Sequence, residues 1–410
     1  MDVFPTVNQF NSNPAYTSIL RTLKTNEEKI GLGDAVLYHT FPLYRDDEGG
    51  LIVADCVLLS RMHGVIPFAL SSDSEELSVS SVRRCQEVAE QVPSFIQSRL
   101  IKNRALRKSP TRLAFEIQPV TYAPFLGKET ELEEITVLRT ERDLCDFFAS
   151  IVDEMSEEMF RELVATIEGA KGLIRPKKRN ISDHLDTSKG RQAEMLEAAI
   201  MLFDHQQKHG MMGRINGPQR IRGLAGSGKT VVLAMKVAQT LLHEPEAKIA
   251  YTFYTKSLYQ HVKRLITRFY RQFDDRDPDW EKSVHILHAW GGTSNPGLYS
   301  VACEKNGVQP ISYRQAAART AGDKFDFACK TFLKDQQLRP YMTTYSLTRG
   351  KITHYPLSIC AASWPRRPVC VSRRRTANNL PNQNVEHCRH LRERSIRETT
   401  IYIRRRHRTP

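Results

Sequence analysis

The chain has 410 residues, 40% of them apolar, which is enough for two or three domains with sizeable cores. No apolar run reaches about 18 residues, which excludes a membrane-spanning helix, and the first residues lack the basic and apolar regions of a secretory signal. The net charge is +14, but residues 341–410 hold 15 Lys and Arg against 3 Asp and Glu, so they carry +12 of it. The total charge is therefore weak evidence for a nucleic-acid partner. Eight cysteines without a CxxC pair indicate reduced thiols and a cytoplasmic protein.

The first 130 residues have strand and helix patterns in alternation, and we expect a mixed α/β domain over residues 1–130. Runs of alternating or continuous apolar residues, bounded by turn residues, predict strands at 36–43, 51–60 and 63–70 and a strand pair at 111–125. A helix is predicted over 80–103, with a bend or break at Pro93. Residues 131–189 follow as a helical connector, because helical spacing over 141–171 gives way to a polar, basic stretch.

Residues 190–341 have the pattern of a second α/β domain. In chain order they predict a helix, a short strand, a helix, a strand and a helix, at 190–207, 219–223, 230–242, 248–255 and 257–273. From Met342 the apolar periodicity ends and arginines cluster, so residues 342–410 are predicted to be a disordered basic tail.

The strongest motif is Gly-Leu-Ala-Gly-Ser-Gly-Lys-Thr at 223–230, which fits the phosphate-binding pattern G-x-x-x-x-G-K-[ST] between a predicted strand and a predicted helix. Its glycines let backbone N–H groups approach phosphate oxygens, and the following helix adds its positive dipole end. Lys229 is expected to neutralise β/γ-phosphate charge as the catalytic residue, and the Thr230 hydroxyl to hold Mg²⁺. We therefore expect ATP and Mg²⁺ to bind at Gly223, Leu224, Ala225, Gly226, Ser227, Gly228, Lys229 and Thr230.

This loop and the segments around it resemble the first RecA-like domain of superfamily 1 helicases of the UvrD/Rep-like group, over about residues 190–340. The resemblance implies that Gln207, with Gln206 as the alternative, reads the adenine. It also implies contacts with single-stranded nucleic acid from TFYTKSL (252–258) and HILHAWGG (285–292), through Thr252, Tyr254, Lys256, His288 and Trp290. For Tyr254 and Trp290 the competing interpretation is that they are core aromatics.

The N-terminal segment resembles, more weakly, a nuclease-related domain of the restriction-endonuclease-like fold. That family has an acidic residue on one strand and Gly-Val-x-x-x-Glu-x-Lys on the next, which hold Mg²⁺ and activate water. Asp55 and Gly64-Val65 match this pattern, whereas Ala69 and Ser71 stand at the Glu and Lys positions. We therefore expect a nuclease-like fold without nuclease activity.

The helicase resemblance also implies an acidic strand about 100 residues after the loop, ending in Asp-Glu. Its lead, Arg339-Pro340-Tyr341, is present, but MTTYSLTRGKI follows and no Asp occurs after Asp335. Synonymous codons for Met342–Ile352 exist that, read two nucleotides later, encode Asp-Asp-Ile-Leu-Ile-Asp-Glu-Gly-Gln-Asp. We infer that residues 342–410 are translated out of frame.

These observations favour a truncated superfamily 1 helicase or translocase that binds ATP and has lost its motor activity. Whether it is an enzyme stays open, because without Asp-Glu we expect no efficient ATP hydrolysis. Single-stranded nucleic acid is the expected partner, with DNA favoured over RNA and no membrane, and the N-terminal domain is a further candidate site for a protein partner. The competing functions are a non-enzymatic module that binds ATP and nucleic acid and, less favoured, a P-loop kinase or signalling NTPase.

Overall fold

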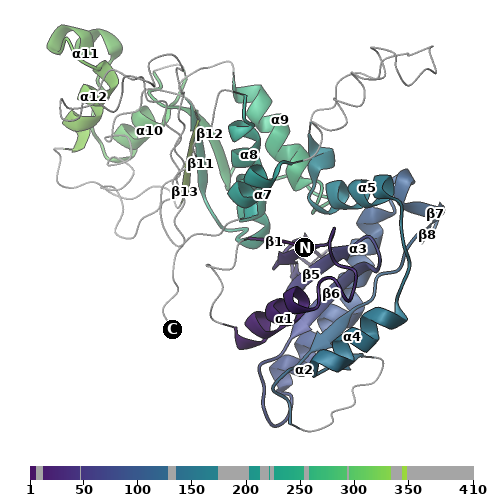
Figure 1. Cartoon of the computed structure of the whole chain (residues 1–410). Coiled ribbons are helices and arrows are strands. Elements are labelled where there is room, and N and C mark those ends of the chain that lie inside the picture. The colour runs from purple at the N-terminus through teal and green to yellow at the C-terminus, as the bar shows by residue number, and fades with distance from the viewer. Residues whose placement is uncertain are drawn as a thin grey trace, which may run out of the picture. The chain divides into compact units, whose positions relative to one another are not determined.

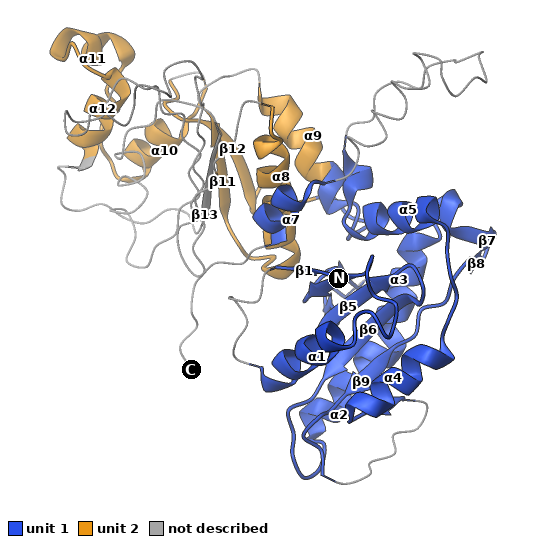
Figure 2. Cartoon of the chain, in the orientation of Figure 1, with its two compact units in different colours: residues 1–213, 268–277 blue, residues 214–267, 278–410 orange. Residues whose placement is uncertain are grey.

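The computed structural model has a mixed α/β fold divided into two compact units (Figures 1 and 2). Unit 1 comprises residues 1–213 and 268–277, and unit 2 comprises residues 214–267 and 278–410. The structure describes residues 1–5, 13–46, 48–127, 135–173, 203–212, 221, 226–253, 258–292 and 295–333, and the backbone of 344–348.

Unit 1 contains a six-stranded sheet, two small two-stranded sheets and the helices around them. Its strands are β1 (Asp2–Phe4), β2 (Val36–His39), β3 (Tyr44–Arg45), β4 (Leu51–Ile52), β5 (Cys56–Ser60), β6 (Gly64–Leu70), β7 (Arg107–Ser109), β8 (Arg112–Leu113), β9 (Val120–Tyr122) and β10 (Val137–Leu138). Its helices are α1 (Pro14–Thr25), α2 (Val79–Gln86), α3 (Val92–Leu100), α4 (Glu141–Ser150), α5 (Glu157–Ile167) and α7 (His205–Met212), with 3₁₀ turns at Arg104–Leu106 and Ala170–Gly172.

The large sheet has the strand order β1-β2-β5-β6-β9-β10. Strand β5 pairs antiparallel with both β2 and β6, whereas β1, β9 and β10 join parallel to their neighbours. The predicted strands at 36–43 and 63–70 are thus present in shortened form, whereas the one predicted at 51–60 is divided into β4 and β5, which belong to different sheets. The two small sheets pair β3 with β4 and β7 with β8.

Both faces of the large sheet are buried, and period-2 alternation assigns residues to each face. One face packs against α1 and α4, because Cys56, Leu58, Ile66 and Phe68 share a core cluster with residues of both helices. The intervening residues Val57, Leu59 and Val65 are equally buried, and α2 contacts β6. A sheet covered on both faces explains the nearly continuous apolar runs of β5 and β6.

The helix predicted over 80–103 is interrupted just before Pro93. A π-helical turn, Glu87–Gln91, separates α2 from α3, and Pro93 stands in the first turn of α3. Proline lacks an N–H donor, so an interruption at this point accommodates it without losing a hydrogen bond inside a regular helix. The expected bend or break at Pro93 is therefore a change of helix type.

Unit 2 is built on a sheet of three parallel strands in the order β12-β11-β13. Its strands are β11 (Ile249–Phe253), β12 (Val284–His288) and β13 (Thr344–Thr348), and its helices are α8 (Lys229–His243), α9 (Tyr259–Tyr270), α10 (Leu298–Lys305), α11 (Tyr313–Arg319) and α12 (Lys324–Leu333). Figure 1 shows α8 and α9 on one side of this sheet and α10 on the other. The end of α9 is counted with unit 1.

The two units divide the chain differently from the boundaries predicted at 130, 189 and 341. Residues 135–173 are part of unit 1 rather than a separate connector, because β10 pairs with β9 and α4 packs into the sheet core. Helix α7 also belongs to unit 1 rather than to the second domain. Strand β13 lies in the segment predicted to be a disordered tail, and the rest of 342–410 is outside the described residues.

Two composition-based expectations can be compared with the described part of the chain. None of its helices is long and apolar enough to cross a bilayer. Its five cysteines, which are Cys56, Cys85, Cys145, Cys303 and Cys329, are all free and buried.

Candidate functional site

The described part of the glycine loop, Gly226–Thr230, turns directly into α8. Gly226 and Gly228 have φ of 85° and 71°, and the Gly228 N–H donates to the Gly226 carbonyl at 2.8 Å. This left-handed backbone is the conformation that glycine adopts at little cost, which explains the two glycines. Gly223, Leu224 and Ala225, which complete the motif, lie outside the described residues.

Helix α8 begins without a side-chain cap. Gly228 is its N-cap and has no side chain to accept from the first-turn N–H groups, which are the natural ligands of an anion. The ammonium group of Lys229 lies 3.1 Å from the Ser227 hydroxyl. Lys229 and Thr230 are half-buried, whereas Gly226 and Ser227 are exposed. The loop therefore presents backbone donors and one cation at a solvent-accessible turn.

The three parallel strands of unit 2 end at one edge of their sheet. The register pairs Phe253 of β11 with His288 of β12 and with Thr348 of β13. In parallel α/β sheets the carboxyl edge is the usual place for ligands. The resemblance located its nucleic-acid contacts here, and Tyr254 and Lys256 of that set are outside the described residues.

Thr252 does not serve as a surface contact, because its side chain is fully buried. It stands in the central strand β11, whose five residues are all buried. Its hydroxyl has no hydrogen-bond partner among the described residues. Because every residue of β11 is buried, the Thr252 side chain lies in the protein interior and is not exposed to a ligand.

Trp290 is a core residue, so the competing interpretation of this aromatic is the one that agrees with the structure. Its side chain is only 8% exposed, and its indole N–H donates to the Ile311 carbonyl at 3.1 Å. Its ring packs against Tyr299, Tyr313 and Phe325. This aromatic group holds the segment after β12 against the helices α10–α12.

His288 organises the turn that follows β12. Its Nδ1 lies 3.2 Å from the backbone nitrogens of both Trp290 and Gly291, and accepting from them requires an unprotonated Nδ1. Gly291 has φ of 82°, and a Cβ there would collide with the backbone of Gly297. The glycines of this segment thus permit two backbone stretches to touch, and the half-buried His288 has a structural use.

Gln207 takes part in a reciprocal cap at the start of α7. Its N–H donates to Asp204 Oδ1 at 2.7 Å, and its side-chain oxygen accepts from the Asp204 N–H at 3.3 Å. The amide expected to read adenine therefore has a local role as a capping box. Gln206, the alternative residue, is exposed.

Helix α7 is fixed to unit 1 by a buried ionic group that the sequence did not indicate. Lys208 lies 2.7 Å from Oε1 of Glu168, a fully buried carboxylate that also accepts from the Tyr38 hydroxyl. Burial raises the pKa of Glu168, against the lowering effect of Lys208. Burial, with Glu168 as the next cause, raises the pKa of Tyr38 well above its ordinary value. The Lys208 ammonium also lies 5.5 Å from the centre of the Phe4 ring.

Of the positions matched to the nuclease pattern, Asp55 lies close to Leu70 at one end of β5 and β6, whereas Gly64 lies at the other end. The register of β5 and β6 pairs Cys56 with Phe68, the Asp55 N–H donates to the Phe68 carbonyl, and Leu70 donates to Asp55 Oδ2 at 2.8 Å. Ala69 and Ser71, which flank Leu70, are buried. Of these three positions, Asp55 alone carries an ionisable side chain.

The remaining carboxylate, that of Asp55, forms an ion pair with Arg84. Its Nη2 and Nε lie 3.1 and 3.3 Å from Asp55 Oδ1, and its Nη1 lies 3.4 Å from Glu87. No cluster of three or more metal-ligating side chains occurs in the part of the chain that the structure describes. Arg84 follows Asp55 by 29 residues in a helix with no motif, so no local signal could have revealed it.

Comparisons with known proteins add no assignment: no protein-family model, no curated protein and no solved structure matches the chain.

Proposed function

We propose that this chain is a nucleotide-binding module of the superfamily 1 helicase type, which binds ATP with Mg²⁺ and single-stranded nucleic acid without efficient hydrolysis. One observation carries the proposal, namely the glycine turn that leads into the uncapped start of α8. Left-handed glycines, a helix start without a side-chain cap and a lysine at the first helical position suit the phosphates of a nucleotide. Lys229 would neutralise phosphate charge and Thr230 would ligate Mg²⁺.

The parallel sheet supports the absence of turnover. Strand β13 pairs with β11 in register from Ile249–Thr344 to Phe253–Thr348, so it reaches the carboxyl edge. Its sequence is Thr-Tyr-Ser-Leu-Thr, which supplies no carboxylate for the Mg²⁺ shell or for the attacking water. The inferred frame shift would place Asp-Glu at the end of this strand, where such acids are needed.

For unit 1 we propose a restriction-endonuclease-like fold without nuclease activity. Its role is either structural or to bind a partner. The element order α1-β2-β5-β6-α2-α3-β9 supports the fold. The Asp55–Arg84 ion pair supports the absence of nuclease activity, because the guanidinium of Arg84 is paired with the carboxylate that a metal ion would need as a ligand.

The test is nucleotide binding by the full chain, titrated with a fluorescent ATP analogue and Mg²⁺. Lys229→Ala should weaken binding at least 10-fold, because phosphate charge loses its nearest cation. The matched control is Lys248→Ala, an exposed lysine next to the amino end of β11, and it should bind like the parent. Equal binding by the parent and Lys229→Ala would refute the assignment of the loop.

A further inference from the structure

The helices α10, α11 and α12 carry an exposed aromatic side chain that the core does not need. Tyr313, the first residue of α11, is 62% exposed, whereas Trp290 beneath it is 8% exposed. The two ring centres lie 5.7 Å apart at an interplanar angle of 55°. Tyr313 therefore presents an aromatic surface whose position is fixed by a buried ring.

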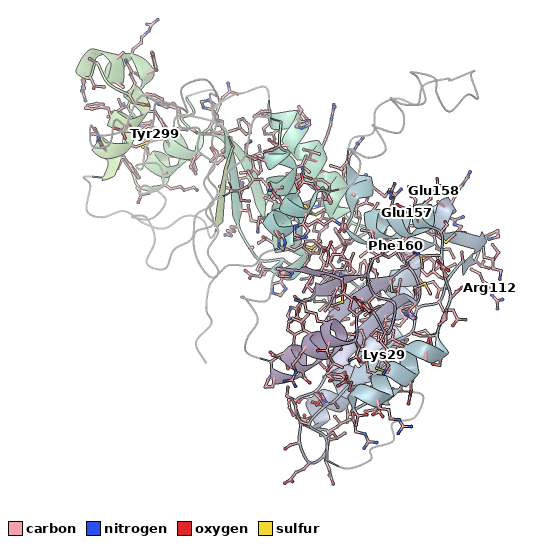
Figure 3. All side chains as sticks on the ribbon, in the orientation of Figure 1. Lys29, Arg112, Glu157, Glu158, Phe160 and Tyr299 are labelled. Atoms are coloured by element: carbon pink, nitrogen blue, oxygen red, sulfur yellow. The ribbon has the colours of Figure 1, made fainter. Side chains whose placement is uncertain are left out.

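Helix α11 has anchors besides the contact of the Tyr313 ring with Trp290. Ala316 is its buried residue, and Ser312 and Gln315 form a capping box at its start. Just before it, the Ile311 carbonyl accepts from Trp290 and the Ile311 N–H donates to the Tyr299 hydroxyl at 3.0 Å. Figure 3 labels Tyr299 among these helices.

The residue next to Tyr313 on the same helix face leaves the ring open. Ala317 is four positions further on and lies beside Tyr313 on the helix surface, and it is exposed and small. A long side chain at this position would cover part of the ring. The ring is thus accessible to a flat partner that approaches from solvent.

Helix α11 also carries two arginines, one and six positions after Tyr313. Arg314 and Arg319 are exposed, and neither has a carboxylate partner among the described residues. Of the acids in this helical group, Asp326 is already paired with Lys330 at 2.9 Å. Residues 295–333 hold five Lys and Arg against three Asp and Glu. The local charge therefore favours an anionic partner.

We infer that Tyr313 is a stacking platform for one base of single-stranded nucleic acid, with Arg314 and Arg319 contacting the flanking phosphates. This inference rests on the proposed function, and it transfers the aromatic contact expected of Trp290 to a residue that no motif indicated. An exposed ring on a short helix that also carries two exposed arginines matches a strand whose bases are unstacked and whose backbone is anionic. A duplex would offer only phosphates, because its base faces are already stacked.

The experiment measures binding of a fluorescein-labelled oligothymidylate of about 15 nucleotides to the full chain by anisotropy. Tyr313→Ala should weaken binding about 5- to 160-fold, the range found for loss of one stacking partner. Tyr313→Phe keeps the ring and should bind within about twofold of the parent. The matched control is Phe125→Ala, an aromatic residue in unit 1 that is 45% exposed, which should leave binding unchanged.

A second measurement tests the phosphate contacts. The double variant Arg314→Ala/Arg319→Ala should bind more weakly and reduce the slope of log K against log salt by about 1.4, as expected for two contacts with a single strand. An unchanged slope would contradict these two contacts. Circular dichroism of each variant should match the parent, because the three substituted side chains are exposed.

Three results would overturn the inference: equal binding by Tyr313→Ala and the parent, a loss with Tyr313→Phe as large as with Tyr313→Ala, or no binding of oligothymidylate by the parent. Displacement of the DNA by poly-glutamate with the same dependence on Tyr313 would assign the surface to an acidic protein instead. Binding of the fluorescent ATP analogue is measured in parallel. The proposed ATP site depends on Lys229 and not on Tyr313, so nucleotide binding that persists when DNA binding is absent would refute this inference without refuting the ATP site.

Discussion

Arg84 and Asp55 form a bridge between α2 and the start of β5, in which two guanidinium nitrogens approach the same carboxylate oxygen at 3.1 and 3.3 Å. Both side chains are about a quarter exposed, so the pair is screened by solvent and its contribution to stability is modest. Its larger effect is chemical, because a carboxylate that accepts from Arg84 and from the Leu70 N–H is already satisfied.

We predict that the chain does not cleave DNA with Mg²⁺ or Mn²⁺. One carboxylate, paired with Arg84 and without the Glu and Lys that Ala69 and Ser71 replace, cannot hold a metal and activate water. Nicking of supercoiled plasmid should stay at the level of a protein-free control. The prediction would be wrong if metal-dependent cleavage appeared and Asp55→Ala abolished it.

We predict that the 410-residue chain shows no ATP turnover stimulated by single-stranded DNA. Loss of a positioned base and of a metal-holding Asp lowers such a reaction by about 10²- to 10⁴-fold. Phosphate release should equal that of Lys229→Ala, with and without DNA. Sequencing of the message around codon 341 should also reveal the alternative frame, and a chain with the frame restored after Tyr341 should regain turnover.

Robust DNA-stimulated turnover by the 410-residue chain itself would contradict this prediction. It would mean that a carboxylate other than one on β13 acts as the base. If no reading frame around codon 341 encodes Asp-Glu, the inferred frame shift is wrong. The prediction of no ATP turnover would still hold, because it depends only on the residues of the 410-residue chain.

We predict that Glu168 makes the stability of unit 1 depend on pH. Its folded-state pKa is raised, so the native state binds more protons than the unfolded state above the ordinary Glu pKa of about 4.3. The contribution of Glu168 to stability is therefore complete below that value and is lost as the pH rises through the raised pKa. Glu168→Gln should remove this negative slope from a series of urea denaturations between about pH 4 and 7.

The control for this series is Glu157→Gln, an exposed residue of α5 labelled in Figure 3, which should keep the slope of the parent. Lys208→Ala leaves the buried Glu168 without its cation and should lower the free energy of unfolding by about 3 kcal/mol. A slope unchanged by Glu168→Gln would show that another group causes the pH dependence.

We predict that Gly64→Ala destabilises unit 1 by about 2 kcal/mol or more. Gly64 has φ of 75°, and a Cβ there would lie 2.7 Å from the Glu116 carbonyl oxygen, a backbone atom that cannot move aside. Gly33→Ala is the control, because no atom lies within 4 Å of its Cβ position and its φ is not positive. Thermal unfolding of both variants measures the difference, and equal midpoints would exclude this strain.

Local structure was accessible from the sequence because spacing along the chain records it directly. The alternating, strongly apolar segments became β5 and β6, and the glycines of the loop became left-handed residues that lead into α8. The strand pattern around Asp55 and Gly64 correctly predicted two neighbouring strands, whose antiparallel register pairs Gly64 with Ser60 and brings Asp55 close to Phe68. The helix over 141–171 was predicted as one segment, but it ends at Ser150 and restarts at Glu157.

What the sequence by itself determined, then, is that β5 and β6 form strands, that a glycine turn precedes α8, and that no Asp follows Asp335. The tertiary structure decided which side chains are available. It buried Thr252 and Trp290, paired Asp55 with Arg84, joined Lys208 to Glu168 across 40 residues, and left Tyr313 in solvent. The physical reason is that burial and ion pairing depend on neighbours supplied by other elements, through sheet register and helix packing, and spacing within one segment carries no record of them.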